Sequence, residues 1–262
     1  MTFQPIVVGS GLVAWRNLQR TLPGQLEAFA QGAEQMRLVS HFEKSAPTLT
    51  SADAVVSDRQ VLRVALGAYG LQDDLENRYF INRILAEGTT ASDSLANRMA
   101  DSRYQRLSTD FSLDGLSRLI GILPSTAEDI TDQFTQKSFA SAVGESQPNL
   151  RLALNADAEL ERIAVMDVSN DAKWYMIMGD APLRSVIETA LNLPSSFSQL
   201  DIDKQLEVFR EKSQKTFGVD EIDELGSGTR KSDVIDHFLL KSQLNEGQSL
   251  SSQNIALQLL GA

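Results

Sequence analysis

The sequence predicts an all-α protein made of internally duplicated helical units, packed as one elongated or two-lobed body with few or no strands. Three observations predict this class. Apolar residues recur at helical spacing along most of the chain, several segments repeat in the same order, and the composition is ordinary for a globular protein, with 42% hydrophobic and 23% charged residues. The 262 residues suffice for one large domain or two small ones.

The first segment, residues 1–35, opens with the apolar run 6–8 followed by Gly9-x-Gly11. This is the glycine pattern of a dinucleotide-binding unit. Pro23-Gly24 interrupts the following helix, however, and no acidic residue ends a second strand at the required spacing. We therefore expect no bound dinucleotide, and an amphipathic helix whose apolar face carries Trp15, Leu18, Leu22 and Leu26.

The central chain shows further helical faces. They comprise Leu62, Leu66 and Tyr69, then Leu183, Val186, Ile187 and Ala190, then Leu206, Phe209 and Phe217. Ser57 to Gln60 and Ser125 to Glu128 have the capping-box pattern, which predicts two helix starts. The short apolar runs 6–8, 163–168 and 173–178 have the composition of strands, and we interpret them as connectors or helix ends.

A repeat divides this region into two helical units. Residues 61–71 resemble 182–193 with one inserted residue, and 129–138 share five of ten positions with 233–242. A weaker match, 35–38 with 149–152, precedes both. We expect related units at 36–148 and 149–246, in which Phe134 and Phe238 occupy matching core positions.

The last segment, residues 247–262, is a tail that combines Gly, Ser and Gln with Ile255, Leu257, Leu259 and Leu260. Three interpretations stay open for it: a frayed end, a helix docked on the protein itself, and a helix that docks on a partner.

The charge of the chain restricts its partners. The net charge is −11, and such a surface repels nucleic acid and anionic lipid heads. With no cysteine, the chain has no disulfides or thiolate metal sites. The N-terminus lacks the pattern of a cleaved secretion signal, and no apolar run is long enough to span a membrane. We expect a cytoplasmic protein, with export by a route that cleaves no signal left open.

The sequence contains no recognisable catalytic, cofactor or metal site. His41 and His237 are the two histidines, and neither has a partner at metal-ligand spacing. A calcium-loop pattern begins at Asp167 but lacks the glycine and the closing glutamate that the loop requires. The acidic residues 220–224, like Asp73 and Asp74, could act as acid and base only in a pocket that separates their pKa values.

Large aromatic residues and the apolar tail are the candidates for partner contact. They are Trp15, Trp174, Tyr175, Ile255 and Leu259. For Trp174 and Tyr175, burial in the core is the competing interpretation, because aromatic side chains supply much of a core's buried area.

Several stretches together resemble one alphaproteobacterial family of unknown function. They are residues 14–29, 58–71, 149–154, 173–194 and 200–218, of which 58–71 and 173–179 are the most specific. Members of that family often contain the domain twice, and their genes tend to lie among flagellar basal-body and rod genes. The resemblance implies a link to the flagellum and provides no catalytic residues.

We therefore expect a non-enzymatic protein-interaction protein that assists the assembly or regulation of the bacterial flagellum. Its partners would be basal-body, rod or export components, and self-association is left open. The alternative, from another class, is a small-molecule-binding protein or an enzyme that uses the carboxylates of residues 73–74 or 220–224.

Overall fold

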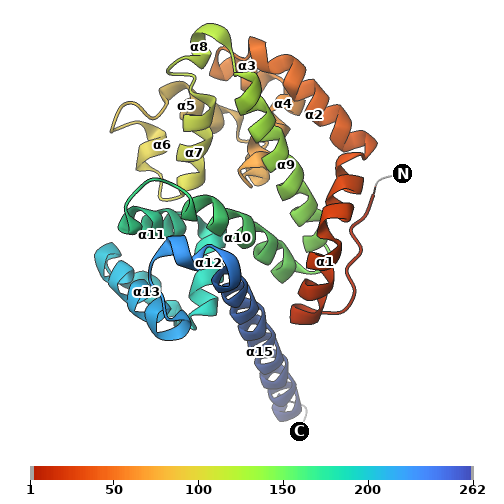
Figure 1. Cartoon of the computed structure of the whole chain (residues 1–262), viewed down its shortest axis with the longest axis vertical. Coiled ribbons are helices and arrows are strands. Elements are labelled where there is room, and N and C mark those ends of the chain that lie inside the picture. The colour runs from red at the N-terminus through yellow and green to blue at the C-terminus, as the bar shows by residue number, and fades with distance from the viewer. Residues whose placement is uncertain (1–2, 261–262) are drawn as a thin grey trace. The chain divides into compact units, whose positions relative to one another are not determined.

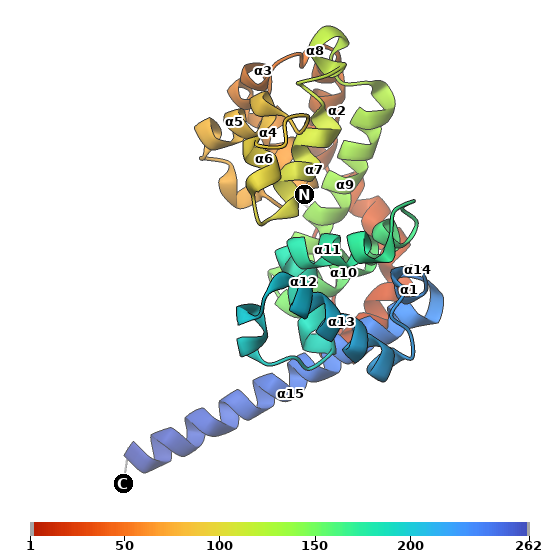
Figure 2. The same ribbon diagram turned by 90° about the vertical axis from the view of Figure 1, so that its left-hand side faces the viewer.

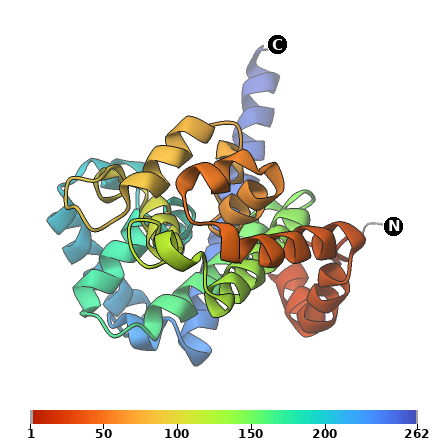
Figure 3. The same cartoon turned by 90° about the horizontal axis from the view of Figure 1, so that it is seen from above.

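The computed structural model describes residues 3–260, without the side chains of residue 195 and residues 247–260. Every regular element in this described part is a helix (Figure 1, Figure 2, Figure 3). The predicted all-α class is confirmed. Of the three ambiguous runs, 6–8 is a connector, 163–168 contains a helix end and a turn, and 173–178 lies within a helix.

The chain forms two compact units. Unit 1 contains the residues up to Ile6 together with Gln19–Glu145, and unit 2 contains Val7–Leu18 together with the chain from Ser146 onward. The segment predicted as 1–35 is thus shared between the two units. The segment predicted as a tail, 247–262, continues the last helix of unit 2 as far as Leu260.

Unit 1 consists of short and long helices in sequence. Besides the second half of α1, they are α2 (Ala33–Ser45), η1 (Ala46–Thr48), α3 (Ala52–Ser57), α4 (Arg59–Ala68), η2 (Gln72–Asp74), α5 (Arg78–Glu87), α6 (Leu95–Arg98), α7 (Ser102–Phe111), α8 (Ser117–Ile120) and α9 (Pro124–Gly144).

Unit 2 begins with the first half of α1 and continues after α9. Its other helices are α10 (Pro148–Ala164), α11 (Asn170–Gly179), α12 (Ala181–Ala190), η3 (Ser195–Gln199), α13 (Ile202–Phe217), α14 (Ile222–Leu225) and α15 (Gly228–Leu260).

Helix α1 runs unbroken from Gly11 to Ala30 with Pro23 inside it, so the predicted interruption at Pro23-Gly24 is wrong. Proline removes one helical hydrogen bond, but tertiary packing on both sides of it holds the helix. Before Pro23, Trp15 is buried. After it, the Phe29 ring packs edge-on against Phe139, with ring centroids 5.7 Å apart.

Three helices form the centre of each unit. In unit 1, α2, α4 and α9 all pack against one another, and in unit 2, α10, α12 and α15 do the same. The predicted apolar faces of α4 and α12 lie in these centres, because Leu62, Leu66 and Tyr69 are buried, as are the four residues predicted for α12. Phe134 and Phe238 are also buried.

The helix starts differ from the predicted capping boxes. Asp58, not Ser57, precedes α4, and its Oδ1 accepts hydrogen bonds from the backbone N–H groups of Gln60 and Val61 at 2.9 and 3.2 Å. Ser57 is instead the last residue of α3. Helix α9 begins at Pro124, because proline suits the first helical position, and this places Ser125 inside the first turn.

Candidate functional site

Two of the predicted contact residues, Trp15 and Trp174, are buried, so their assignment to a partner surface is wrong. Trp15 is 1% exposed and Trp174 is fully enclosed. The Trp174 indole stacks on Phe209 with ring centroids 5.6 Å apart, and its Nε1–H donates to the carbonyl oxygen of Asp220 at 2.9 Å. Since the indole N–H is satisfied inside the protein, the ring serves as core.

Tyr175, Ile255 and Leu259 have other outcomes. Tyr175 is 38% exposed, and its hydroxyl donates to Asp203 Oδ1 at 2.9 Å. It lies at the surface of unit 2 and is held there by this bond. The side chains of Ile255 and Leu259 lie outside the described residues, and their role in contact remains a prediction.

The acidic run 220–224 is used in structural pairs. Arg210 donates from Nε to Asp220 Oδ2 at 2.9 Å. The buried Lys173 donates to Asp223 and, at 2.8 Å, to the carbonyl oxygen of Ala164 at the end of α10. The Lys173 contacts join α14 to α10 and α11, and the Arg210 contact joins the segment before α14 to α13. They do not gather two carboxylates in a pocket, as acid–base chemistry would require.

The two histidines lie in different surroundings. His41 Nε2 is 2.7 Å from Asp58 Oδ2, on the carboxylate that caps α4. The His237 ring contacts Phe217, with centroids 5.2 Å apart. Among the described residues, no cluster of three or more His, Asp or Glu side chains is placed to hold a metal ion.

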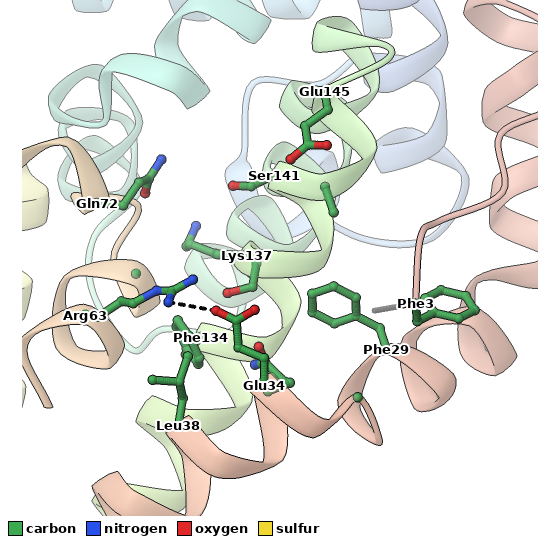
Figure 4. A pocket seen from close by; sticks show the side chains of 15 residues that line it. Phe3, Phe29, Glu34, Leu38, Arg63, Gln72, Phe134, Lys137, Ser141 and Glu145 are labelled. Atoms are coloured by element: carbon green, nitrogen blue, oxygen red, sulfur yellow. Dashed lines mark hydrogen bonds and ion pairs between the residues drawn. The ribbon is translucent and has the colours of Figure 1, made fainter. Parts of the chain in front are cut away.

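A cavity of about 290 Å³ lies within unit 1, between α2, α4, α9 and the second half of α1 (Figure 4). Its apolar lining consists of Phe3, Phe29, Leu38 and Phe134, together with Gly32, Gly67 and Ala142. Its polar lining consists of Glu34, Gln35, Arg63, Gln72, Lys137, Ser138, Ser141 and Glu145.

Gly67 of α4 is one of the residues that line the cavity. A Cβ at this position would lie 2.7 Å from Phe134 Cδ2, closer than carbon atoms pack. The glycine therefore lets the Phe134 ring of α9 lie directly on the backbone of α4. A glycine in the middle of an otherwise strong helix is the one sequence signal that points here, because such a residue often marks a close approach.

The polar side of the cavity combines one ion pair with one buried amide. Arg63 Nη1 donates to Glu34 Oε1 at 2.8 Å, an ion pair between α4 and α2 drawn as a dashed line in Figure 4. Gln35 is only 7% exposed, and its Nε2 donates to Thr135 Oγ1 at 3.0 Å.

An extended stretch of the chain reaches the apolar side of the cavity. Phe3 and Phe29 both line it, and Figure 4 shows their two rings at the same side. Ile6, three residues after Phe3, makes two main-chain hydrogen bonds with the Gln25 side chain of α1. The Ile6 N–H donates to Gln25 Oε1 at 2.7 Å, and Gln25 Nε2 donates to the Ile6 carbonyl at 3.1 Å. The cavity thus has a peptide-like segment at its edge.

A second feature of unit 1 is an exposed apolar stretch around α8. Leu119 is 78% exposed, and Leu116, Ile120 and Leu123 are also exposed. Contiguous apolar surface of this kind is typical of protein interaction sites. None of these exposed residues was predicted as a contact, and of the cavity lining only Phe134 was predicted, as a core residue, because neither feature has a sequence motif.

None of the helices in the described part of the chain combines the length and the hydropathy that crossing a bilayer requires.

The comparisons with known proteins place the chain in a family. The family described as "Protein of unknown function (DUF1217)" matches residues 68–225, more than half of the chain. The chain belongs to this family. The match begins within α4 and ends with α14, so it includes most of both units.

A solved structure has the same fold. The crystal structure of protein AGR_C_984 from Agrobacterium tumefaciens is similar to the chain with a TM-score of 0.68 and 20% sequence identity. The similarity covers 92% of this chain and 97% of that one. At this identity the likeness shows the fold alone. No curated protein matches the chain.

Proposed function

We propose that this member of the DUF1217 family is a non-enzymatic protein-interaction protein that takes part in assembly or regulation of the bacterial flagellum. We propose further that it binds its partner protein at the cavity of unit 1. The flagellar part of the proposal rests on the sequence resemblance and its gene setting. The proposal includes a cytoplasmic location or association with the flagellum itself, and partners among basal-body, rod or export components.

The observation that carries the binding role is the segment at the edge of the cavity. Phe3 contributes an aromatic ring to the lining, while Gln25 holds the main chain of Ile6. An apolar anchor in a pocket with main-chain hydrogen bonds beside it is how proteins recognise extended peptides. The same chemistry suits a segment of a partner protein.

The size of the cavity favours a side chain over a whole small molecule. Pockets for drug-sized ligands measure about 300–1,000 Å³, and this one, at about 290 Å³, is at the lower limit of that range. Of its four charged lining residues, Glu34 and Arg63 already neutralise each other. The alternative of a carboxylate-dependent enzyme also loses support, because Asp220 and Asp223 pair with Arg210 and Lys173.

A crosslinked affinity capture from a flagellated native host tests the proposal. Full-length tagged wild type is compared with Ser141→Phe, which places a ring in the cavity from its lining. The matched control is Ser125→Phe on the exposed face of the same helix, α9. We expect rod, basal-body or export proteins in the wild-type and Ser125→Phe captures, and their loss by tenfold or more with Ser141→Phe.

Two outcomes would contradict the proposal in different ways. Equal capture of flagellar proteins by all three forms would keep the flagellar role and remove the cavity from it. Capture of no flagellar component by wild type would remove the flagellar role. Thermal unfolding of Ser141→Phe within a few degrees of wild type is required, because loss of the fold would also abolish capture.

A further inference from the structure

The segment at the cavity edge is bound in the manner of a strand without belonging to a sheet. The Gln25 side-chain amide both accepts from the Ile6 N–H and donates to the Ile6 carbonyl, which reproduces the paired bonds of an antiparallel strand partner. Gln25 Nε2 also donates to Thr21 Oγ1 at 2.8 Å on the same helix. The amide is therefore held in position to receive a main chain.

The sequence of the segment favours the extended form. Pro5 has a fixed φ and no N–H, and it disfavours helical geometry at Gln4. Figure 1 shows the chain running beside α1 before it turns into that helix. The bound conformation consequently needs little ordering.

The segment is held by few contacts. Ile6 is 65% exposed, so its side chain adds little burial, and the bonds to Gln25 are exposed to water. The Phe3 ring, half-buried at the cavity, is the main apolar anchor. A segment held this lightly can leave and return while the helices of unit 1 remain packed.

We propose that the cavity of unit 1 binds an extended segment of a partner protein. This segment has an aromatic anchor, and the main chain three residues after the anchor hydrogen-bonds to Gln25. Residues 3–6 of this chain compete with the partner segment for the same site. This inference rests on the proposed function and names the chemistry of its ligand. The aromatic ring takes the place of Phe3 beside Phe29 in the cavity lining. The residues 3–6 act as a tethered competitor whose effective concentration lowers the affinity for any segment in trans.

The test uses a labelled, N-acetylated peptide with the sequence of residues 2–8 as the probe, and fluorescence anisotropy with full-length protein as the readout. Phe3→Ala weakens the tethered competitor, so it should bind the probe at least tenfold more tightly than wild type. Gln4→Ala is the matched control, because the Gln4 side chain is exposed, and it should bind the probe as wild type does. A probe with alanine in place of its phenylalanine should not bind.

A second variant separates the site from the tether. The double variant Phe3→Ala with Gln25→Ala should lose tenfold or more of the affinity that Phe3→Ala has for the probe. Both positions lie outside the core, so unfolding does not explain a loss, and thermal unfolding verifies this.

Three results would overturn the inference. One is equal affinity of wild type and Phe3→Ala for the probe. Another is no binding of the probe to either form. If Ser141→Phe still loses the flagellar partners in that case, the proposed function is retained and its ligand has a different chemistry. The third is a wild-type dimer in sedimentation that Phe3→Ala dissociates, because the exchanging segment would then come from a second copy.

Discussion

The central helices of the two units, α4 and α12, match at their ends and differ in the residues between them. Helices α4 and α12 start alike, since Asp58 and Asp180 each accept a backbone hydrogen bond at the N-cap. They also end alike, since Gly70 with φ 70° and Asn192 with φ 54° stand at the same distance from those caps. These caps align the helices without the inserted residue that the sequence match required.

Within this alignment, Gly67 of α4 corresponds to Thr189 of α12. Gly67 lets the Phe134 ring lie on the α4 backbone next to the cavity, whereas Thr189 carries a β-branched side chain. At the C-terminal ends the residues differ but the backbone geometry is the same: Asn192 adopts the left-handed conformation that Gly70 adopts freely, because asparagine tolerates it. The lesson is that conserved geometry at the caps permits divergence in the middle. Common descent of the two units remains a prediction that these similarities support.

The helices before α4 and α12 differ in length, and the two units also differ in their aromatic packing. Helix α3 has 6 residues and α11 has 10, and both are capped by a serine, Ser51 or Ser169. Helix α11 carries Trp174, which stacks on Phe209 inside unit 2. In unit 1, the Phe42 and Phe111 rings pack edge-on instead, with centroids 6.3 Å apart.

The largest expected effect is from Trp174→Ala. Truncation of a buried tryptophan costs about 3–5 kcal/mol of the free energy of unfolding, and the loss should be confined to unit 2. Urea unfolding combined with hydrogen exchange checks both points, with protection falling in α11 and α13 and persisting in α4 and α9. Tyr175→Ala on the same helix is the control and should cost far less. An unchanged unfolding midpoint for Trp174→Ala would contradict the assignment of Trp174 to the core.

A smaller effect is expected from Gly67→Ala. Glycine-to-alanine changes inside a helix normally stabilise it by about 0.5–1 kcal/mol. Here the new Cβ would lie 2.7 Å from the Phe134 ring, and overpacking costs about 1–3 kcal/mol, so we expect a net decrease in the free energy of unfolding. Adding Phe134→Leu should recover part of it. A stabilised Gly67→Ala would show that the ring moves freely away from α4.

The smallest effect concerns pH and the cap of α4. Partial burial raises the pKa of Asp58, but hydrogen bonds from His41, Val61 and Gln60 outweigh it, so the pKa lies below its ordinary value. A lowered carboxyl pKa in the folded state gives stability that is present above the unfolded pKa of about 3.9 and is lost as pH falls through the folded pKa.

The measurement is urea unfolding between pH 7 and pH 2.5. Asp58→Asn keeps an N-cap oxygen but has no carboxyl group, so we expect its free energy of unfolding to lose the pH dependence that comes from this site. We expect Asp58→Ala to lower the free energy of unfolding by about 0.5–2 kcal/mol at pH 7. A pH profile of Asp58→Asn that superimposes on that of wild type would contradict the assigned role.

The sequence predicted helices better than it predicted their ends and contacts. Apolar periodicity correctly identified the buried faces of α4 and α12, because burial itself imposes the spacing. The capping pattern misplaced the start of α4 by one residue, since Ser57 and Asp58 both fit a cap and it is Asp58 that accepts the N–H bonds of the first turn. At α9, the pattern overlooked that Pro124 can occupy the first turn.

Other failures came from contacts between distant residues. Pro23 reads as a helix break locally, whereas α1 is continuous and packs on both sides of it through residues such as Trp15 and Phe29. The cavity escaped detection because its aromatic rings and Gln25 come from segments whose proximity no local pattern encodes. The surface assignment of Trp174 failed for the same reason, since its partner is the carbonyl of Asp220.

The division of α1 has a consequence for the order in which the protein is made. Unit 2 needs the first half of α1, where Arg16 pairs with Asp236, a partner 220 positions later in the chain. Unit 1 has all its residues once Glu145 has emerged from the ribosome. At translation rates of about 5–20 residues per second, Arg16 waits roughly 10–40 s for Asp236 to be synthesised. During that interval Trp15 and Leu18 are unburied on a nascent chain, where chaperones would meet them first.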